Sequence, residues 1–294
     1  MLAVDLGQSG ARIRIDNQEF NSKRAKLAGE NAWDSLRAIF SELPKLQSEI
    51  VALSLTGFNG IVAHEEKFAD LCKEFFGAKE VAVIDDGLAG YIGTLSGRKG
   101  VTLLIGGGVV SVGGKDGKFS HRDGLGSIFG DEGSGYWLGK LALTRALAIE
   151  EGRDNGEEFL ELMKAEVKEF HQLSAKNGSE AVSLAIKAAR PLLNAADAGI
   201  PVAVEIRNQG ATLLAKTVIS TWFGVEGRAD ESLEVVINGG LSLNLGYYNQ
   251  IKYEVLRQLT NAKFVQPEGD NLSGAIWIAE HRKEDAPPML KWAR

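Results

Sequence analysis

Short apolar runs rich in β-branched residues recur along the chain and predict strands. Each run is six residues long or shorter. Most of them end in Gly or Asp, which is typical of a strand that enters a tight turn. The runs are Leu2–Val4, Arg12–Ile15, Ile50–Leu55, Val81–Ile84, Val101–Ile105, Val109–Val112 and Leu233–Ile237.

Between these runs, apolar residues return every three or four positions, which is the period of a helix with one buried face. A segment from about 136 to 224 contains almost nothing but such periods, interrupted near Gly152–Gly156, Asn177–Gly178 and Gly199–Pro201. Trp222 and Phe223, at its end, are expected in the core. Other helices are expected at about 33–43, 68–76, 247–259 and 273–281.

Buried strands separated by helices favour an α/β fold with parallel strands and covered faces. The order strand, glycine turn, strand occurs at 3–15 and again at 101–112, and helices and further strands follow each time. We therefore expect a two-lobed protein with a duplicated core and a mostly helical insertion in its second half.

The composition is that of an ordinary globular protein, with 294 residues, 44% of them hydrophobic and 24% charged. A net charge of −6 without a basic run argues against a nucleic-acid or anionic-membrane partner, because these partners need clustered positive charge. One cysteine, Cys72, excludes an internal disulfide framework and fits a reducing compartment. We expect it to pack in a helix.

The chain opens on Met-Leu-Ala-Val-Asp-Leu-Gly, which has no positively charged leader. Its least charged stretch, 101–114, is far shorter than the roughly 20 residues of a membrane span. We therefore expect a cytoplasmic protein without a membrane segment. The four histidines have no metal-ligand spacing and are expected at the surface, with His121 of interest because it precedes a glycine-rich motif.

Two glycine turns each follow a predicted strand, Gly7–Gly10 after Asp5 and Gly106–Gly108 after Ile105. Glycine lets backbone N–H groups approach an anion closely, so either turn could hold phosphate. Neither is a Walker loop or a dinucleotide fingerprint. A hairpin without a ligand is the alternative for each.

Several carboxylates are further candidates for functional residues. Asp85 and Asp86 end an apolar run, where ligands gather in α/β sheets, and we interpret Asp85 as the cap of the following helix. The segment 124–137 is rich in glycine and precedes a predicted helix. There Ser134 is interpreted as a helix cap and Asp131 as a functional residue.

Taken in order, these segments resemble the sugar-kinase, heat-shock and actin superfamily, and specifically the N-acetylglucosamine kinase branch of the BadF/BadG/BcrA/BcrD ATPase family. The most specific match is Gly-Asp-Glu-Gly-Ser-Gly-Tyr-Trp-Leu-Gly at 130–139. The other matching segments are a first phosphate motif at 3–15, an acidic segment at 83–94, a second phosphate motif at 101–112, an adenosine motif at 235–243, then 195–203 and Gly274-Ala275.

The resemblance implies a two-lobed actin-like ATPase fold, related to ribonuclease H, with duplicated β-β-β-α-β-α-β-α cores. The first lobe would comprise residues 1–104 and the C-terminal helix at about 273–294. The second would comprise 105–272, with the helical insertion at about 140–230. A homodimer is expected because dimers are common in the family.

The resemblance also implies an ATP-dependent kinase that phosphorylates an amino sugar or hexose. Asp86 would be the general base, and Asp5 would hold Mg²⁺ through water. The residues implied to bind the sugar are Asn31, Gly130 and Asp131. Those implied to bind ATP are Gly7, Gln8, Ser9, Gly106, Gly107, Gly108, Gly239 and Gly240.

Two alternatives stay open. Val109 and Val110 stand where relatives have polar residues, Leu125 replaces a tryptophan, and Gly10-Ala11 replaces a Lys-Thr pair. These departures are compatible with a sugar- or nucleotide-binding sensor that has little turnover. The second alternative, an ATPase activator of a dehydratase, resembles an iron–sulfur homodimer with two cysteines per subunit, whereas this chain has one.

Overall fold

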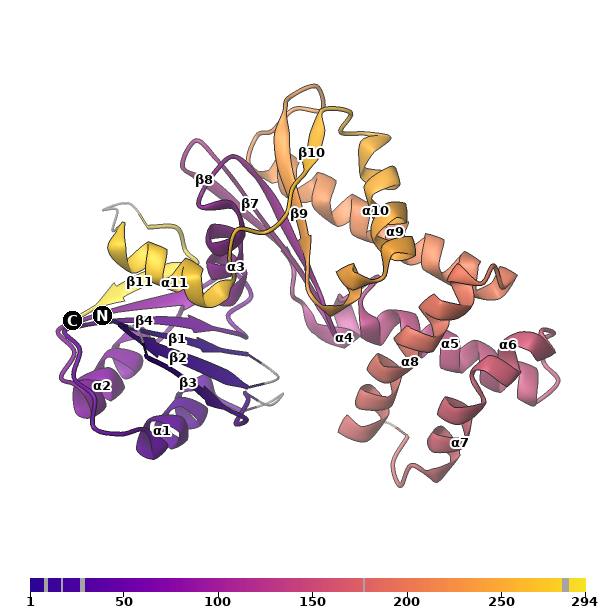
Figure 1. Cartoon of the computed structure of the whole chain (residues 1–294), viewed down its shortest axis with the longest axis horizontal. Coiled ribbons are helices and arrows are strands. Elements are labelled where there is room, and N and C mark those ends of the chain that lie inside the picture. Colours follow the sequence, from indigo (N-terminus) through magenta and orange to yellow (C-terminus); the bar gives the residue numbers. More distant parts are fainter. Residues whose placement is uncertain (8–9, 17, 27–29, 177, 282–285) are drawn as a thin grey trace.

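Every apolar run that predicts a strand lies within a strand of the structure. The computed structural model describes residues 1–7, 10–16, 18–26, 30–176, 178–281 and 286–294. Two lobes, each built on one mixed β-sheet, are visible in Figure 1, and both chain termini lie in the first lobe.

The first sheet has the strand order β11-β5-β4-β1-β2-β3. Strands β1, β4 and β5 run parallel, while β2, β3 and β11 are antiparallel to their neighbours. Its strands are β1 (Leu2–Leu6), β2 (Ala11–Ile15), β3 (Gln18–Ser22), β4 (Ile50–Leu55), β5 (Glu80–Asp85) and β11 (Leu290–Ala293). The helices of this part of the chain are α1 (Ala32–Glu42), α2 (Glu65–Phe76) and α3 (Asp86–Leu95).

The second sheet has the order β10-β9-β6-β7-β8, with β6, β9 and β10 parallel. Its strands are β6 (Gly100–Ile105), β7 (Val109–Lys115), β8 (Lys118–Asp123), β9 (Leu233–Asn238) and β10 (Ala262–Phe264). After β9 come a short 3₁₀ helix η1 (Gly240–Leu243), α10 (Leu245–Leu256) and α11 (Asn271–Glu280). Apart from β11 and the insertion, both lobes follow the same β-β-β-α-β-α-β-α order, so the expected duplicated α/β fold is confirmed.

Helices fill the region between the third and fourth strands of the second lobe, as expected. They are α4 (Gly126–Phe129), α5 (Gly135–Glu150), α6 (Glu157–Leu162), α7 (Lys164–Gln172), α8 (Ser179–Asp197) and α9 (Pro201–Gly224). The apolar faces of α5 to α9 and one face of the second sheet form a single core, which includes Trp222. Phe223, expected in the core, is instead 47% exposed, although the preceding residue of α9 is fully buried.

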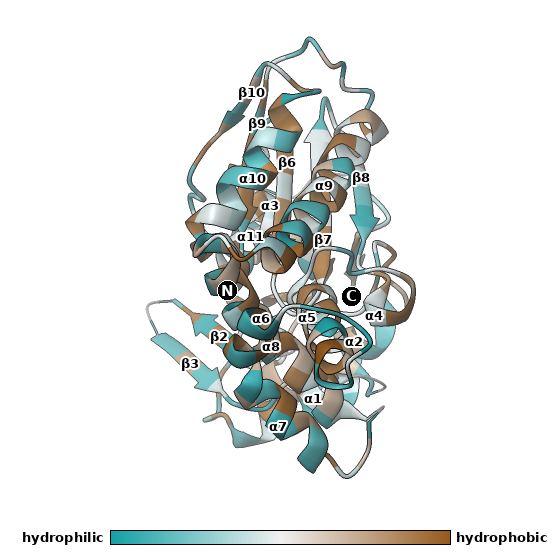
Figure 2. Ribbon diagram, turned by 90° about the vertical axis from the view of Figure 1, so that its right-hand side faces the viewer, coloured by the Kyte–Doolittle hydropathy of each residue, from teal (hydrophilic) through white to brown (hydrophobic). Residues whose placement is uncertain are grey.

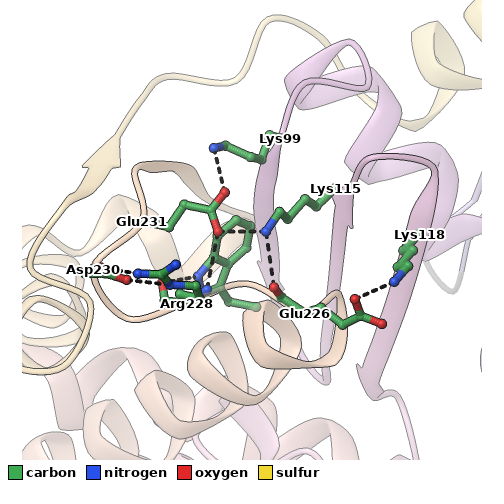
Figure 3. A network of polar contacts seen from close by, with 8 residues as sticks. Lys99, Lys115, Lys118, Glu226, Arg228, Asp230 and Glu231 are labelled. Carbon is green, nitrogen blue, oxygen red and sulfur yellow. Dashed lines mark hydrogen bonds and ion pairs between the residues drawn. The ribbon is translucent and has the colours of Figure 1, made fainter.

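Ion pairs and hydrogen bonds attach the C-terminal end of the helical insertion to the second sheet (Figure 3). They lie at the opposite end of the strands from the Gly106–Gly108 turn. There Glu231 bonds to Lys99 before β6 at 2.9 Å and to Lys115 of β7 at 2.7 Å. Hydrogen bonds from Lys115 and Lys99 lower the pKa of Glu231 to about 2. Lys115 also donates to the Glu226 carbonyl oxygen at 3.1 Å. The loop from α9 to β9 is thereby held against the hairpin of β7 and β8.

Helices α3 and α11 form a layer between the two sheets. α11 follows the second lobe in the chain but packs on strands β4 and β1, whereas α3 follows β5 and packs on β6 and β7. Their close approach depends on glycine, because a Cβ on Gly93 would lie 1.9 Å from the Asp270 carbonyl oxygen, and one on Gly274 1.9 Å from that of Ala89. We propose that α11 belongs to the first lobe, as expected from the resemblance. We place the lobe boundary before β6 at Gly100 rather than after residue 104, because the whole of β6 belongs to the second sheet.

Strands β3 and β8 have no apolar run that predicts them. Their residues are mostly polar, and Figure 2 shows β3 in hydrophilic colours. Both are held by antiparallel pairing to a neighbour, so the hairpin rather than a buried face determines them. Within the described part of the chain, no helix has the length and apolar character needed to cross a lipid bilayer.

Candidate active site

The carboxyl ends of the parallel strands of both sheets carry most of the predicted site residues. In the first sheet, Asp5 lies at the end of β1, and Asp85 and Asp86 lie at the junction of β5 and α3. In the second, Gly106–Gly108 follow β6 and Gly239–Gly240 follow β9. Ligands of open α/β sheets gather at such strand ends.

The first glycine turn joins β1 to β2. The Gly7 N–H donates to the Gly10 carbonyl oxygen at 3.0 Å. Gly10 has a φ of +148°, and a Cβ on it would lie 2.7 Å from the Ser22 carbonyl oxygen, so only glycine fits there. Gln8 and Ser9 lie outside the described residues.

Asp5 is held by two side chains. Its Oδ2 accepts a hydrogen bond from Arg12 at 2.9 Å, and its Oδ1 accepts one from Ser54 at 3.0 Å. Arg12 also donates to Asp270, the cap of α11, at 2.6 Å. Although burial opposes its charge, the hydrogen bonds to Asp5 and Asp270 keep the pKa of Arg12 above its ordinary value. Arg12 thus connects β1 to the start of α11.

Arg12 was not singled out from the sequence, although a signal for it exists. It is the antiparallel partner of Asp5 across the hairpin. Directly opposed residues of two strands point to the same face, where opposite charges pair favourably. The register set by the Gly7–Gly10 turn therefore predicts the pair.

Asp85 caps α3, as expected. Its Oδ1 accepts from the Gly87 N–H and its Oδ2 from the Gly60 N–H, both at 3.0 Å, and the residue is 1% exposed. The neighbouring carboxylate of Asp86 has a different environment. Desolvation, followed by repulsion from Asp85, raises the pKa of Asp86 to about 7, against a hydrogen bond from Thr56 that lowers it. Asp86 therefore exchanges a proton near neutral pH.

The second glycine turn lies against the start of α5. Within the turn, the Gly106 N–H donates to the Gly108 carbonyl oxygen at 2.9 Å, and the Gly135 N–H donates to that of Gly106 at 2.8 Å. Gly239 lies beside the same strand end, since a Cβ on it would be 2.4 Å from the Ile105 carbonyl oxygen. A Cβ on Gly106 or Gly240 would meet nothing within 4 Å, so both backbones face open space.

Asp131 connects the glycine-rich segment to this turn. Its Oδ1 accepts from the Val109 N–H at 2.8 Å, and its own N–H donates to Asp123 at 2.9 Å. Burial, opposed by the Val109 hydrogen bond, raises its pKa. Gly130 leaves room for Asp123, because a Cβ there would lie 2.4 Å from Asp123 Oδ1. Asp131 is thus 8% exposed and supports the turn through one oxygen. Ser134 caps α5, as expected.

Val109 and Val110 have packing roles. Val109 lies in the core of the second lobe, and Val110 packs against the core around α3. A Cβ on Gly87 would lie 3.2 Å from a methyl group of Val110 and 3.0 Å from one of Val112. The start of α3, which carries Asp86, therefore rests directly on β7.

Asn31 lies at the start of α1, and Lys26 borders the first glycine turn. Asn31 precedes α1 with an exposed side chain, and no hydrogen bond joins it to the other predicted residues that the structure describes. Lys26 donates its backbone N–H to the Gly7 carbonyl oxygen at 3.1 Å, and its ammonium group would lie 2.9 Å from a Cβ on Gly57. No sequence pattern identifies Lys26, because the chain brings it back to this turn only after β3.

A protein-built metal centre is absent from the described residues, since no three His, Cys, Asp or Glu side chains gather there. Cys72 is fully buried in α2, as expected, and desolvation raises the pKa of its thiol. His64, His171 and His281 are exposed, as expected, whereas His121 is largely enclosed.

The chain is similar to a curated N-acetylmuramic acid/N-acetylglucosamine kinase of Clostridium acetobutylicum. The two are 26% identical over 212 residues, which cover 68% of this chain and 67% of the relative.

Solved structures share the fold over nearly the whole chain. An N-acetylglucosamine kinase candidate from Chromobacterium violaceum has a TM-score of 0.69 and 22% identity, covering 95% of this chain and 98% of that one. A ROK family glucokinase from Streptomyces griseus, solved with glucose and AMPPNP, has a TM-score of 0.58 and 17% identity, with 95% and 99% covered. These likenesses concern the actin-like sugar-kinase fold.

The family match extends over both lobes. The model of the BadF/BadG/BcrA/BcrD ATPase family covers residues 2–279, and thus both glycine turns, Asp86 and Asp131. The chain belongs to the BadF/BadG/BcrA/BcrD ATPase family.

Proposed function

We propose that this protein is an ATP-dependent carbohydrate kinase that transfers the γ-phosphate of ATP to a hydroxyl of an amino sugar or hexose. N-acetylglucosamine and glucosamine are the favoured types of acceptor. The observation that carries the proposal is the position of Asp86 at the start of α3, next to the carboxyl end of β5, where burial and repulsion from Asp85 raise its pKa to about 7. The family and the kinases named above support it.

Asp86 has the properties that a general base for a sugar hydroxyl needs. Its pKa lies near the working pH, and its side chain is partly exposed. By contrast, both carboxylate oxygens of Asp85 accept hydrogen bonds from backbone N–H groups, and the residue is buried. We therefore assign proton acceptance to Asp86 and support of α3 to Asp85.

The two glycine turns fit a polyphosphate. Open space at Gly106 and Gly240 leaves room for a ligand, and backbone N–H groups in glycine turns attract anions. When bound, ATP supplies the phosphoryl group. Gly7, Gly106, Gly107 and Gly108 would hold its phosphates, and Gly239 with Gly240 its adenosine.

Asp5 fits Mg²⁺ in an outer-sphere role. Both of its oxygens already accept hydrogen bonds, from Arg12 and Ser54. Mg²⁺ usually keeps several waters and takes one or two carboxylates plus substrate phosphates. We propose that Asp5 orients water on a magnesium ion held chiefly by ATP. Asn31 and Asp131 are proposed to contact the sugar.

The activity should follow the protonation of Asp86. Because the base must be unprotonated, kcat/KM should fall about tenfold per pH unit below pH 7 and level off above it. Initial rates between pH 5.5 and 8.5, in buffers of constant ionic strength, measure this profile. A rate that stays constant down to pH 5.5 would exclude Asp86 as the titrating base.

Lys26 is proposed to supply positive charge at the first turn, where family members have a lysine and this chain has Gly10. No carboxylate of the described residues forms an ion pair with Lys26, whereas Arg12 is held by Asp5 and Asp270. Lys26→Ala should raise KM for ATP about tenfold, the loss of one charge-assisted contact. Lys23→Ala, an exposed neighbour, is the control. Equal KM values for both variants would contradict this role.

A coupled assay of ADP release tests the proposed function. The acceptor panel is glucosamine, N-acetylglucosamine, N-acetylmannosamine and glucose, each with Mg-ATP. Sugar-dependent turnover by the wild type is the expected result. If no acceptor supported turnover but calorimetry showed sugar binding, the alternative of a sugar-binding sensor would be favoured instead. The dehydratase-activator alternative would require iron and sulfide in anaerobically purified protein.

A further inference from the structure

His121 occupies an unusual position for a histidine of this chain. Its side chain is 13% exposed, whereas the other three histidines are exposed. It lies on β8 as the antiparallel partner of Val112, and Val112 packs in the core around α3. His121 therefore comes from the second sheet but faces the layer that carries Asp86.

Two glycines, one from each lobe, make the space for the imidazole ring. A Cβ on Gly60, in the loop after β4, would lie 3.0 Å from His121 Cγ, and one on Gly124, after β8, would lie 3.2 Å from His121 Cε1. Both glycines have φ in the left-handed region, +83° and +73°. Side chains at either position would displace the ring.

The ring faces Asp85 across the lobe junction. His121 Nε2 lies 3.7 Å from Asp85 Oδ1, slightly beyond hydrogen-bond distance. Asp85 in turn accepts the N–H groups of Gly60 and Gly87. A residue of the second lobe thus adjoins the carboxylate that fastens the first turn of α3.

We propose that His121 is a positioning residue that, through Asp85, holds the start of α3 and hence the Asp86 carboxylate in place relative to the second glycine turn. This inference rests on the proposed function. Asp86 follows Asp85 directly, so a displacement of Asp85 displaces the base. A misplacement of about 1 Å costs about a hundredfold in rate when reacting groups must align.

The charged groups around the ring determine its protonation. Desolvation lowers the pKa of His121, opposed by Asp85 on β5 and by Asp123 on β8, and assisted by Arg122. Desolvation thus favours the neutral form of the ring. In the tautomer that carries the hydrogen on Nε2, the ring directs an N–H dipole toward Asp85, and a small approach of the lobes would complete a hydrogen bond.

Three variants test this role in the full-length protein. His121→Leu removes the dipole, His121→Gln keeps an N–H donor, and His171→Leu removes an exposed histidine as the control. We expect His121→Leu to lower kcat about 10- to 100-fold with KM for ATP nearly unchanged. The acid limb of its pH profile should move to higher pH, because the Asp85 negative charge that raises the pKa of Asp86 would then be less offset by a neighbouring dipole. His121→Gln should recover most of kcat.

A role in packing alone would lower thermal stability and leave the acid limb of the remaining activity in place, which would overturn the proposal. Hydrogen exchange at the Gly60 and Gly87 amides gives a readout independent of turnover. Loss of their protection in His121→Leu, but not in His171→Leu, is expected. Unchanged protection of these amides would overturn the proposed role of His121, whether or not the protein phosphorylates a sugar. Failure of the wild type to phosphorylate any sugar would by itself contradict only the proposed function.

Discussion

Asp86→Asn is expected to lower the sugar-dependent rate of ADP release about 10²- to 10⁴-fold, the usual contribution of a positioned general base. Asparagine has the same shape but cannot accept the proton of the attacking hydroxyl. The glycine turns proposed to bind ATP are unchanged in this variant, so the KM for ATP should change little. Steady-state rates at pH 8 measure both quantities. Unchanged turnover would contradict the assignment of Asp86 as base.

A stability measurement on the same variant excludes unfolding as the cause. The pKa of Asp86 rises from an ordinary 3.8 to about 7 in the folded protein. The folded state therefore binds more protons than the unfolded state between these values, and stability falls as pH rises through that window. Removing the charge should raise the free energy of unfolding at pH 8 by about 1 to 4 kcal/mol. An inactive but stabilised variant would show that the loss is chemical.

Gly274→Ala is expected to have the largest effect on stability. Its new methyl carbon would lie 1.9 Å from the Ala89 carbonyl oxygen, so α11 must move away from α3. Overpacking of this kind costs about 3 kcal/mol, and here the displaced α3 also carries Asp86. The midpoint of urea unfolding and kcat should therefore fall together.

The matched control is Gly178→Ala, where the added methyl group would meet only Ala175, at 3.7 Å. That variant should keep wild-type stability within about 0.5 kcal/mol. If Gly274→Ala were as stable as Gly178→Ala, the close contact between α3 and α11 would be refuted.

Much of the fold follows from local patterns. Buried strands such as β4 and β6 carry apolar runs, and glycine turns mark their ends. Strands β3 and β8 could not be predicted, because their pairing to β2 and β7 is a tertiary effect that leaves no hydrophobic period. Phe223 shows the same limit, since which side of α9 faces the sheet depends on packing rather than on hydrophobicity alone.

The candidate site likewise contains residues that sequence motifs predict and residues that only the fold brings there. Motif order predicts Asp86 and the glycine turns as site residues, and this stays a prediction, whereas the predicted caps Asp85 and Ser134 are confirmed. His121 and Lys26 could not be placed from sequence, because each reaches the site from a strand or loop distant along the chain. Val110 illustrates the reverse case. It departs from the family pattern, and the structure gives it a packing contact with the start of α3.

The most direct test of the central claim is whether ATP turnover makes a sugar phosphate. Wild-type protein is incubated with Mg-ATP and each acceptor, and ADP and phosphorylated sugar are quantified together by ³¹P NMR. We predict one sugar phosphate per ADP for at least one amino sugar or hexose, and none with Asp86→Asn over the same interval. ADP accompanied by inorganic phosphate alone, or no product with any acceptor, would contradict the assignment as a carbohydrate kinase.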